Sequence, residues 1–311
     1  MDRKNSEYVT KYIANIILFL LFVVSYSFAN EEGDKMNGKI GVDYLMYAEL
    51  EVRNCSAEGY INGIPFHICR FDSSESPKVS FPVNQYLIDG QNMIELVINP
   101  GPTPSKAKEG KNVEKADGIA AEFRLVTYPV GVFVGDESGK TICRASWHNE
   151  KGGEATFPMS FTSVVDLGPV FGPCLWQKAD VLRLDKSTTN QVIDFIKVIY
   201  DAYEAGKPEI INKLASIRLN EGYRAYPERD RSTMGRRFAV NLKKRAAMKE
   251  WTMLPFNPDL FDLRLCAGGR MVECIRKDWQ PIVAATLEDK NVVYSYAMFL
   301  SRINGQWVIV R

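Results

Sequence analysis

Histidine is scarce in this chain, whose 311 residues include only His67 and His148. Neither histidine lies at metal-ligand spacing from Asp, Glu or Cys on an evident shared element. The sequence also lacks a Cys-x-x-Cys pair, which is the spacing typical of many zinc sites. We therefore interpret both histidines as structural or surface residues, and we expect neither a metal nor another cofactor.

Long apolar runs are also lacking, with one exception near the N-terminus. Residues Ile13–Val24 carry no charge, basic residues precede them, and the small residues Ser27 and Ala29 follow. This layout is that of a secretory signal peptide, which predicts residues 1–29 as the signal and cleavage after Ala29. The alternative is an uncleaved membrane anchor over residues 13–29, although a spanning helix needs about 20 mostly apolar residues. We expect a periplasmic or secreted protein whose only membrane contact is through this segment.

Neither sign of charge dominates, because 39 basic residues oppose 38 acidic ones. The balance is uneven along the chain: residues 30–186 contain 16 basic and 22 acidic residues (net −6), and residues 187–311 contain 20 and 14 (net +6). Four cations share one face of a predicted helix over residues 233–251: Arg236, Arg237, Lys243 and Lys244. We interpret this face as solvated rather than as a site for an acidic partner or a membrane, and we expect no nucleic-acid partner.

The six cysteines form an even set, which permits disulfides in an exported chain. Neighbours in sequence give three candidate pairs: Cys55 with Cys69, Cys143 with Cys174, and Cys266 with Cys274. The third pair requires a hairpin with an odd loop centred near Arg270, because a two-residue Gly-Gly turn places Cys266 opposite Met271. The alternative for each cysteine is a buried thiol.

The region 30–186 has the pattern of an all-β domain. Ala48, Leu50 and Val52 alternate with charged residues, which is typical of a half-buried strand. Asn-Gly and Asp-Gly turns follow at short intervals, so we predict an antiparallel β-sandwich. The Pro- and Lys-rich segment Gly101–Gly118 is predicted to be a mobile, solvated loop.

Two stretches, Tyr60–Pro65 and Leu87–Val97, together resemble the turn-and-strand pattern of galactose-binding-like jelly rolls. The resemblance supports a sandwich more than it supports carbohydrate binding, because a turn before a strand is enough to require the Gly and Asn. A carbohydrate site needs exposed aromatic side chains over a polar floor, and the candidates are Trp147, Trp176 and Tyr128. Burial of both tryptophans would count strongly against this function.

The hydrophobic period changes to that of helices after residue 186. Apolar residues recur at helical spacing between Val192 and Tyr203, with Thr189 or Asn190 as a predicted N-cap. Two further helices are predicted, over about 208–220 and 233–251. Five strands follow in the predicted order: Leu260–Cys266, Met271–Arg276, Pro281–Leu287, Val292–Arg302 and Gln306–Val310.

Three helices followed by an antiparallel sheet ending in Asn-Gly-Gln-Trp-Val-Ile-Val resemble the nuclear-transport-factor-2-like superfamily of cone-shaped α+β domains. The resemblance implies a curved sheet around an apolar pocket, and some members of the superfamily pair as dimers. Some members are enzymes, and others only bind ligands or partners. The residues predicted to line the pocket are Tyr200, Tyr203, Trp251, Asp262, Tyr294 and Tyr296.

We therefore predict two domains, an antiparallel β-sandwich (30–186) and an α+β cone (187–311). No acid and base converge by spacing, so we favour a non-enzymatic binding or interaction protein for a small ligand, a glycan or a protein partner. One alternative is a hydrolase or isomerase acting in the cone, which needs an inward carboxylate of raised pKa beside a tyrosine. The other is carbohydrate binding by the sandwich. A homodimer is expected by analogy only.

Overall fold

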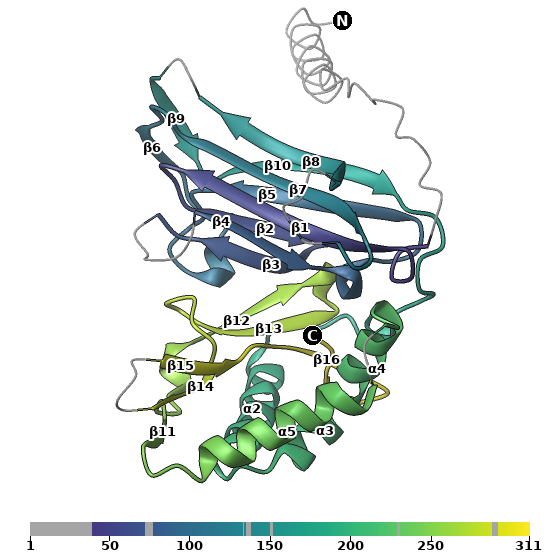
Figure 1. The fold of residues 1–311 in the computed structure, drawn as a ribbon. Helices are drawn as coiled ribbons and strands as arrows, with labels where there is room; N and C mark the ends of the chain where they lie inside the picture. Colours follow the sequence, from purple (N-terminus) through teal and green to yellow (C-terminus); the bar gives the residue numbers. More distant parts are fainter. Residues whose placement is uncertain are drawn as a thin grey trace, which may run out of the picture. The chain divides into compact units, whose positions relative to one another are not determined.

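Strands dominate the first half of the chain in the computed structural model (Figure 1). The structure describes residues 39–71, 77–132, 134, 138–149, 152–228, 231–287 and 292–311. The strands of the N-terminal region (39–166) are β1 (Tyr44–Arg53), β2 (Ala57–Ile61), β3 (Ile64–Cys69), β4 (Lys78–Pro82), β5 (Gln91–Ile98), β6 (Asn112–Lys115), β7 (Ala120–Pro129), β8 (Lys140–His148), β9 (Glu154–Phe157) and β10 (Met159–Asp166). The connecting segment 167–185 contains the short 3-10 helix η3 (Leu175–Lys178).

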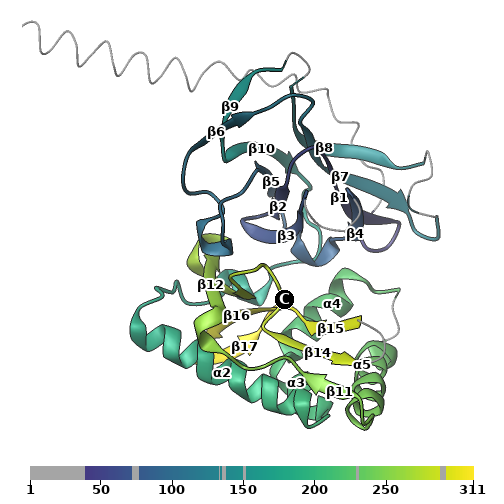
Figure 2. The same cartoon turned by 90° about the vertical axis from the view of Figure 1, so that its left-hand side faces the viewer.

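Helices come first in the C-terminal region (186–311), and strands follow them (Figure 2). The helices are α2 (Lys186–Glu204), α3 (Pro208–Leu214), α4 (Ser216–Ala225) and α5 (Arg231–Ala246). The strands are β11 (Trp251–Met253), β12 (Phe261–Cys266), β13 (Met271–Arg276), β14 (Val283–Leu287), β15 (Val292–Tyr296), β16 (Met298–Ile303) and β17 (Gln306–Ile309).

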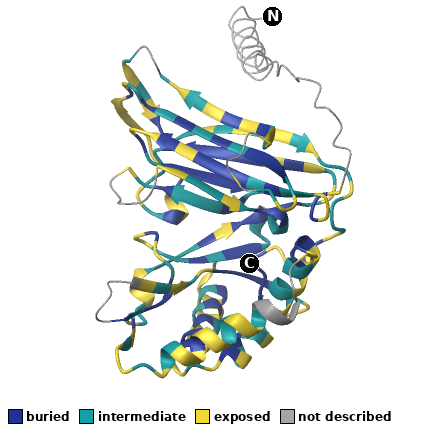
Figure 3. Cartoon of the chain, viewed as in Figure 1, coloured by how far each residue is buried: buried dark blue, intermediate teal, exposed yellow. Residues whose placement is uncertain are grey.

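Two four-stranded antiparallel sheets form most of the N-terminal region, in the orders β4-β1-β7-β8 and β10-β5-β2-β3. The alternation of apolar and charged residues explains the burial of the apolar side chains of β1: Ala48 and Leu50 are fully buried, and Glu51 is exposed. The two sheets contact each other at Gly59 of β2, where an added Cβ would lie 2.9 Å from the ring of Phe123 on β7. Figure 3 shows the buried residues concentrated on these strands.

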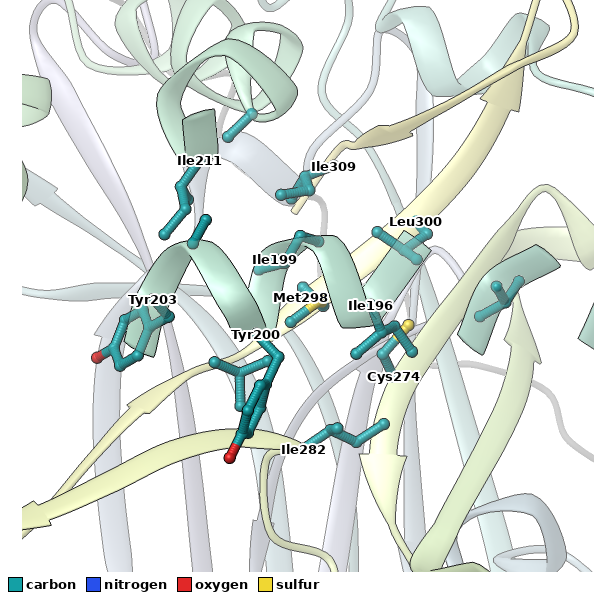
Figure 4. Packing of buried hydrophobic residues seen from close by; sticks show 14 of the residues in the cluster. Ile196, Ile199, Tyr200, Tyr203, Ile211, Cys274, Ile282, Met298, Leu300 and Ile309 are labelled. Carbon is teal, nitrogen blue, oxygen red and sulfur yellow. The ribbon is translucent and has the colours of Figure 1, made fainter. Parts of the chain in front are cut away.

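In the C-terminal region, α2 packs its apolar stripe against strands (Figure 4). The strands form two antiparallel sheets, in the orders β12-β13-β16-β17 and β11-β14-β15. The Asp185 side chain caps α2 by accepting a hydrogen bond from the Thr188 N–H (2.7 Å). The predicted cap at Thr189 or Asn190 is therefore wrong, because the polar residues before Val192 continue the helix by one more turn.

Two of the predicted helices end at other residues in the structure. The predicted helix over 208–220 is two helices, because Ala215 between them has φ −94° and ψ 14°. The predicted helix over 233–251 ends at Ala246, and Trp251 instead begins a strand that pairs with β14. Strand pairing outweighs local helix propensity at this point.

The segment Gly101–Gly118, predicted to be a mobile and solvated loop, contains structure of its own. It includes the 3-10 helix η2 (Pro104–Lys106) and strand β6, which pairs with β9. The Ser105 N–H donates to Asp262 at the start of β12 (3.0 Å). The segment thus joins the N-terminal and C-terminal regions.

All six cysteines are buried and none is joined in a disulfide, so the structure contains none of the three predicted disulfides. Strand register gives the reason in two cases. Cys266 lies opposite Met271, and Cys274 lies opposite Leu263. Cys69 lies opposite Ala57, two residues beyond Cys55. The cysteines are therefore small apolar side chains of the interior.

Antiparallel sheets combined with helices confirm the coarse fold class that the sequence predicts. The described residues all fall within one compact unit, Gly38–Arg311. The predicted signal segment, residues 1–29, lies outside the described residues. Within the described ranges, no helix combines the length and apolarity that crossing a membrane requires.

Candidate functional site

The space under α2, where the sequence predicts a ligand pocket, is occupied by side chains of the protein itself. Ile196 and Ile199 are fully buried and point toward β16, the strand that carries Met298 and Leu300 (Figure 4). Tyr200 and Tyr203, two of the predicted pocket residues, belong to the same apolar cluster. These two tyrosines therefore contribute to the core.

Four of the six predicted pocket residues do come together, as an aromatic cluster. The Trp251 ring centroid lies 5.7 Å from that of Tyr203 and 5.9 Å from that of Tyr294, and Tyr203 lies 6.2 Å from Tyr296. The Arg245 guanidinium covers the Tyr294 ring at 3.8 Å from its centroid, a favourable cation–π contact. Burial raises the pKa of Tyr203 and Tyr296, so these hydroxyls stay protonated at neutral pH.

The remaining two predicted residues lie elsewhere. The Tyr200 hydroxyl donates to the carbonyl of Leu254 (3.0 Å). Asp262 accepts the Ser105 N–H on the surface. The structure therefore does not place Asp262 beside the tyrosines, which is the juxtaposition that catalysis in a cone would need.

The three candidates for sugar contact have different surroundings. Trp176 is 5% exposed and packs in an apolar cluster with Met271. Trp147 is half-buried, and its ring stacks on Phe161 (6.4 Å between centroids). Tyr128 is also buried, but it lines a hollow of about 370 Å³ on the outward face of sheet β4-β1-β7-β8.

We call this hollow the Glu49 pocket. Its lining residues are Glu49, Lys78, Ser80, Arg124, Val126, Tyr128, Val134, Gly139 and Thr141. Strand register assembles it, because Glu49 of β1 lies opposite Ser80 of β4 on one side and opposite Arg124 of β7 on the other. Polar side chains from three neighbouring strands therefore meet in one row.

Glu49 is the centre of the pocket and is only 4% exposed. One carboxylate oxygen, Oε2, accepts from Arg124 Nε (3.0 Å) and Nη2 (2.7 Å), and the other accepts from the Tyr128 hydroxyl (2.8 Å). Burial acts to raise the pKa of Glu49, but the hydrogen bonds and the charge of Arg124 outweigh it and lower that pKa. Glu49 is therefore an ionised acceptor at neutral pH, not a proton donor.

Both cations that line the pocket are paired with carboxylates. Arg124 pairs with Glu49 (2.7 Å) within the lining, and Lys78 pairs with Glu51 (3.4 Å). Each lining charge therefore has an opposite charge beside it, and paired charges attract an ionic ligand less than a lone charge does.

A second buried charge cluster joins the N-terminal and C-terminal regions. Arg264 of β12 donates from Nη2 to Glu58 Oε1 (2.6 Å), from Nη1 to the Tyr60 hydroxyl (2.9 Å) and from Nε to Glu273 Oε2 (2.7 Å). All four side chains are largely buried. Burial raises the pKa of Glu273 to about 7, with Arg264 opposing the shift and the charge of Glu58 adding to it.

This shift predicts a pH-dependent stability. Between the usual carboxyl pKa of 4.5 and about 7, the folded chain holds a proton on Glu273 that the unfolded chain releases. The contribution of Glu273 to stability is therefore present below pH 4.5 and is lost as the pH rises through 7. Urea unfolding at pH 5 and pH 8 should show the decrease in the wild type.

The control for this prediction is Glu273→Gln, which cannot titrate. The difference in unfolding free energy between wild type and variant should change with pH between 5 and 8. A difference that stays constant over this range would show that Glu273 titrates normally.

The four predicted cations of α5 are exposed: Arg236, Arg237, Lys243 and Lys244. The helix has six basic residues and no acidic one, which equals the whole net charge of +6 in residues 187–311. One of these cations, Lys243, pairs with Glu209 (3.6 Å), and both side chains are 63% exposed. Pairs this exposed contribute little to stability.

The chemistry of the described side chains offers few catalytic arrangements. Within the described ranges, no three His, Cys, Asp or Glu side chains group so that they could hold a metal ion. Of the two histidines, His148 is exposed, and His67 lies beside the Phe81 ring (5.7 Å between centroids). Comparison of the chain with protein-family models, curated proteins and solved structures finds no match.

Proposed function

We propose that the protein is a non-enzymatic binding protein whose Glu49 pocket takes a neutral, hydroxyl-rich ligand, which is the chemistry of a glycan unit. The observation that carries this proposal is Glu49 itself, a carboxylate that is 4% exposed at the wall of a hollow. Burying an ion pair gives little net stability, and carboxylates in a cleft whose pKa is shifted by burial and a charged partner are enriched at functional sites. A solvated side chain would serve the sheet equally well.

The groups in the pocket match hydroxyls. The Glu49 carboxylate accepts hydrogen bonds, the Arg124 guanidinium donates them, and the Ser80 hydroxyl does both. Because the charges of the lining are paired, an ionic ligand gains little from them, and the volume of about 370 Å³ lies within the range of small-molecule sites. The lowered pKa of Glu49 disfavours a role as general acid, so the proposal is binding without hydrolysis.

The proposal extends to the fold and the location. We propose that the two N-terminal sheets form a β-sandwich like galactose-binding jelly rolls, and that the C-terminal region is a nuclear-transport-factor-2-like cone filled by its own side chains. The face-to-face contact at Gly59 and Phe123 supports the first, and the packing of α2 on strands supports the second. The signal layout of residues 1–29 supports export to the periplasm or the exterior.

Titration calorimetry with neutral mono- and oligosaccharides tests the proposed function. We expect saturable binding by the wild type and a loss of about tenfold or more in affinity for Glu49→Gln, since a charged acceptor is replaced by a neutral one. Tyr128→Phe should weaken binding less, because it removes only the hydroxyl that orients Glu49. The matched control is Glu154→Gln, an exposed residue on β9, which should bind like the wild type.

Two results would overturn the proposal. One is the absence of binding for every neutral saccharide, and the other is unchanged affinity in Glu49→Gln. Thermal melts of each variant show whether a loss of binding comes from the changed site or from unfolding of the protein. Product analysis after long incubation with a bound saccharide distinguishes a lectin-like role from hydrolysis.

A further inference from the structure

A second hollow lies where the N-terminal and C-terminal regions meet, and we call it the junction cleft. Its volume is about 480 Å³, and its lining residues are Asn62, Ile88, Gln91, Asn92, Met93, Val164, Trp176, Gln177, Ala267 and Arg270. The first six belong to the N-terminal region, and the other four to η3 and the β12–β13 turn. The Ala267 N–H donates to the carbonyl of Gly63 (3.0 Å), so the two regions touch beside the cleft.

One wall of the cleft is apolar and open. Met93 of β5 and Val164 of β10 lie directly opposite each other in register, and they are 38% and 55% exposed. A cross-strand pair of apolar side chains left in water at the wall of a hollow is characteristic of a ligand-binding surface. An apolar ligand group lying on this pair would remove its surface from water.

Some polar groups of the cleft already form hydrogen bonds within the protein, and others could bind a ligand. The Asn62 amide donates to the Tyr86 carbonyl (2.9 Å) and to Asn92 (2.8 Å), and the Asn92 amide donates to the carbonyls of Ile88 and Gly90. The side-chain amides of these two asparagines are therefore already hydrogen-bonded within the protein. Gln177 is partly used as well, because its Oε1 accepts from the Cys174 N–H (2.8 Å). The other polar side chains along the cleft are Gln91 and Arg270.

Arg270 is the only charged residue among those that line the cleft in the described part of the chain. One of its terminal nitrogens, Nη1, donates to the carbonyl of Ala179, which fixes the guanidinium to the connecting segment. A guanidinium has five N–H donors. Further donors therefore remain for a carboxylate, and guanidinium–carboxylate hydrogen bonds are among the strongest in proteins.

We propose that the junction cleft binds a small amphipathic carboxylate, with its charged group on Arg270 and its apolar part over Met93 and Val164. This site is separate from the Glu49 pocket and opposite to it in chemistry, because it combines one cation with an apolar wall. Both regions supply its walls, so the bound carboxylate stabilises their contact. Binding to the folded chain alone also raises the melting temperature.

Octanoate, below its micelle concentration, is the probe for this site, and octanol is the matched neutral probe. We expect octanoate to bind with one-to-one stoichiometry and to raise the melting temperature in proportion to the logarithm of its concentration. Octanol should bind about tenfold more weakly or worse, because it lacks the charge that Arg270 recognises.

Two variants test the two halves of the proposal. Arg270→Gln should reduce octanoate affinity about tenfold or more while leaving octanol binding unchanged. Val164→Asp should weaken both probes, because it places a carboxylate on the apolar wall. Val164 is 55% exposed, so this variant keeps its fold. The control is Val113→Asp on β6, where the side chain is 63% exposed and lies outside the lining set; it should bind both probes like the wild type.

The proposal fails if octanol binds as tightly as octanoate, since Arg270 then contributes no recognition. It also fails if Val164→Asp binds octanoate like the wild type, because the apolar chain of octanoate then lies elsewhere. Weak, non-saturating uptake of octanoate by all variants would show general adsorption to apolar surface and would equally overturn it.

Discussion

Replacing Arg264 with alanine is expected to lower the free energy of unfolding by about 3–5 kcal/mol, because it leaves two buried carboxylates without a counter-charge. The side chains of Arg264 and Glu58 are 8% and 3% exposed, and that of Glu273 is 12% exposed. Little of either carboxylate reaches solvent, so bulk water compensates poorly for the lost guanidinium. The substitution also removes the contact of β12 with Tyr60, so it weakens the junction of the two regions. Urea unfolding at pH 8 measures the loss.

Arg276→Ala is the matched control, since Arg276 belongs to the adjacent strand and pairs with Asp278; their side chains are 19% and 52% exposed. Water reaches the Asp278 carboxylate, so the expected loss of unfolding free energy is about 1 kcal/mol. Adding Glu273→Gln to Arg264→Ala should restore part of the loss by removing one of the stranded charges. Equal costs for the two arginine variants would contradict the assignment of Arg264 to a buried charge cluster.

Ile196→Ala is expected to lower the free energy of unfolding by about 2–5 kcal/mol, because it opens a cavity in a filled interior. Ile196 is fully buried in α2 and faces the strands of the C-terminal region (Figure 4). The size of the loss reports directly on whether this space is packed. Truncating a side chain that borders an open, water-filled pocket would lower the free energy of unfolding much less.

Val198→Ala is the control on the same helix, where the side chain is 49% exposed. It should change the unfolding free energy by about 0.5 kcal/mol or less. If both variants lowered the free energy of unfolding by similarly small amounts, the space under α2 would contain an open cavity. That result would revive a ligand pocket at Tyr200 and Tyr203.

Local signals in the sequence predict much of the fold. Asn62-Gly63 and Asn304-Gly305 adopt the positive φ angles that tight turns require, and they join β2 to β3 and β16 to β17. The apolar stripe between Val192 and Tyr203 is buried along α2 as predicted. Each of these features depends on residues close together in the chain, where turn chemistry and periodicity act.

Both buried charge clusters escaped the prediction for the same reason. Glu49 occupies a position that alternation assigns to solvent, and only the register with Ser80 and Arg124 buries it. Arg264 meets Glu58 across 206 residues of chain, and a single sequence carries no signal for such a pairing. The nearest sequence hint is Tyr128, a candidate for sugar contact that does line the Glu49 pocket.

The separation of Glu58 and Arg264 also bears on when the protein can finish folding. At ribosomal speeds of roughly 5–20 residues per second, Arg264 is made roughly 10–40 s after Glu58. Until then, β2 holds a carboxylate and a tyrosine on a face that has no partner. Contacts of such high sequence separation slow the search for the native state. A nascent chain that ends before β12 therefore lacks the guanidinium that pairs with Glu58 in the folded protein, and burial of Glu58 and Tyr60 has to wait for the C-terminal region.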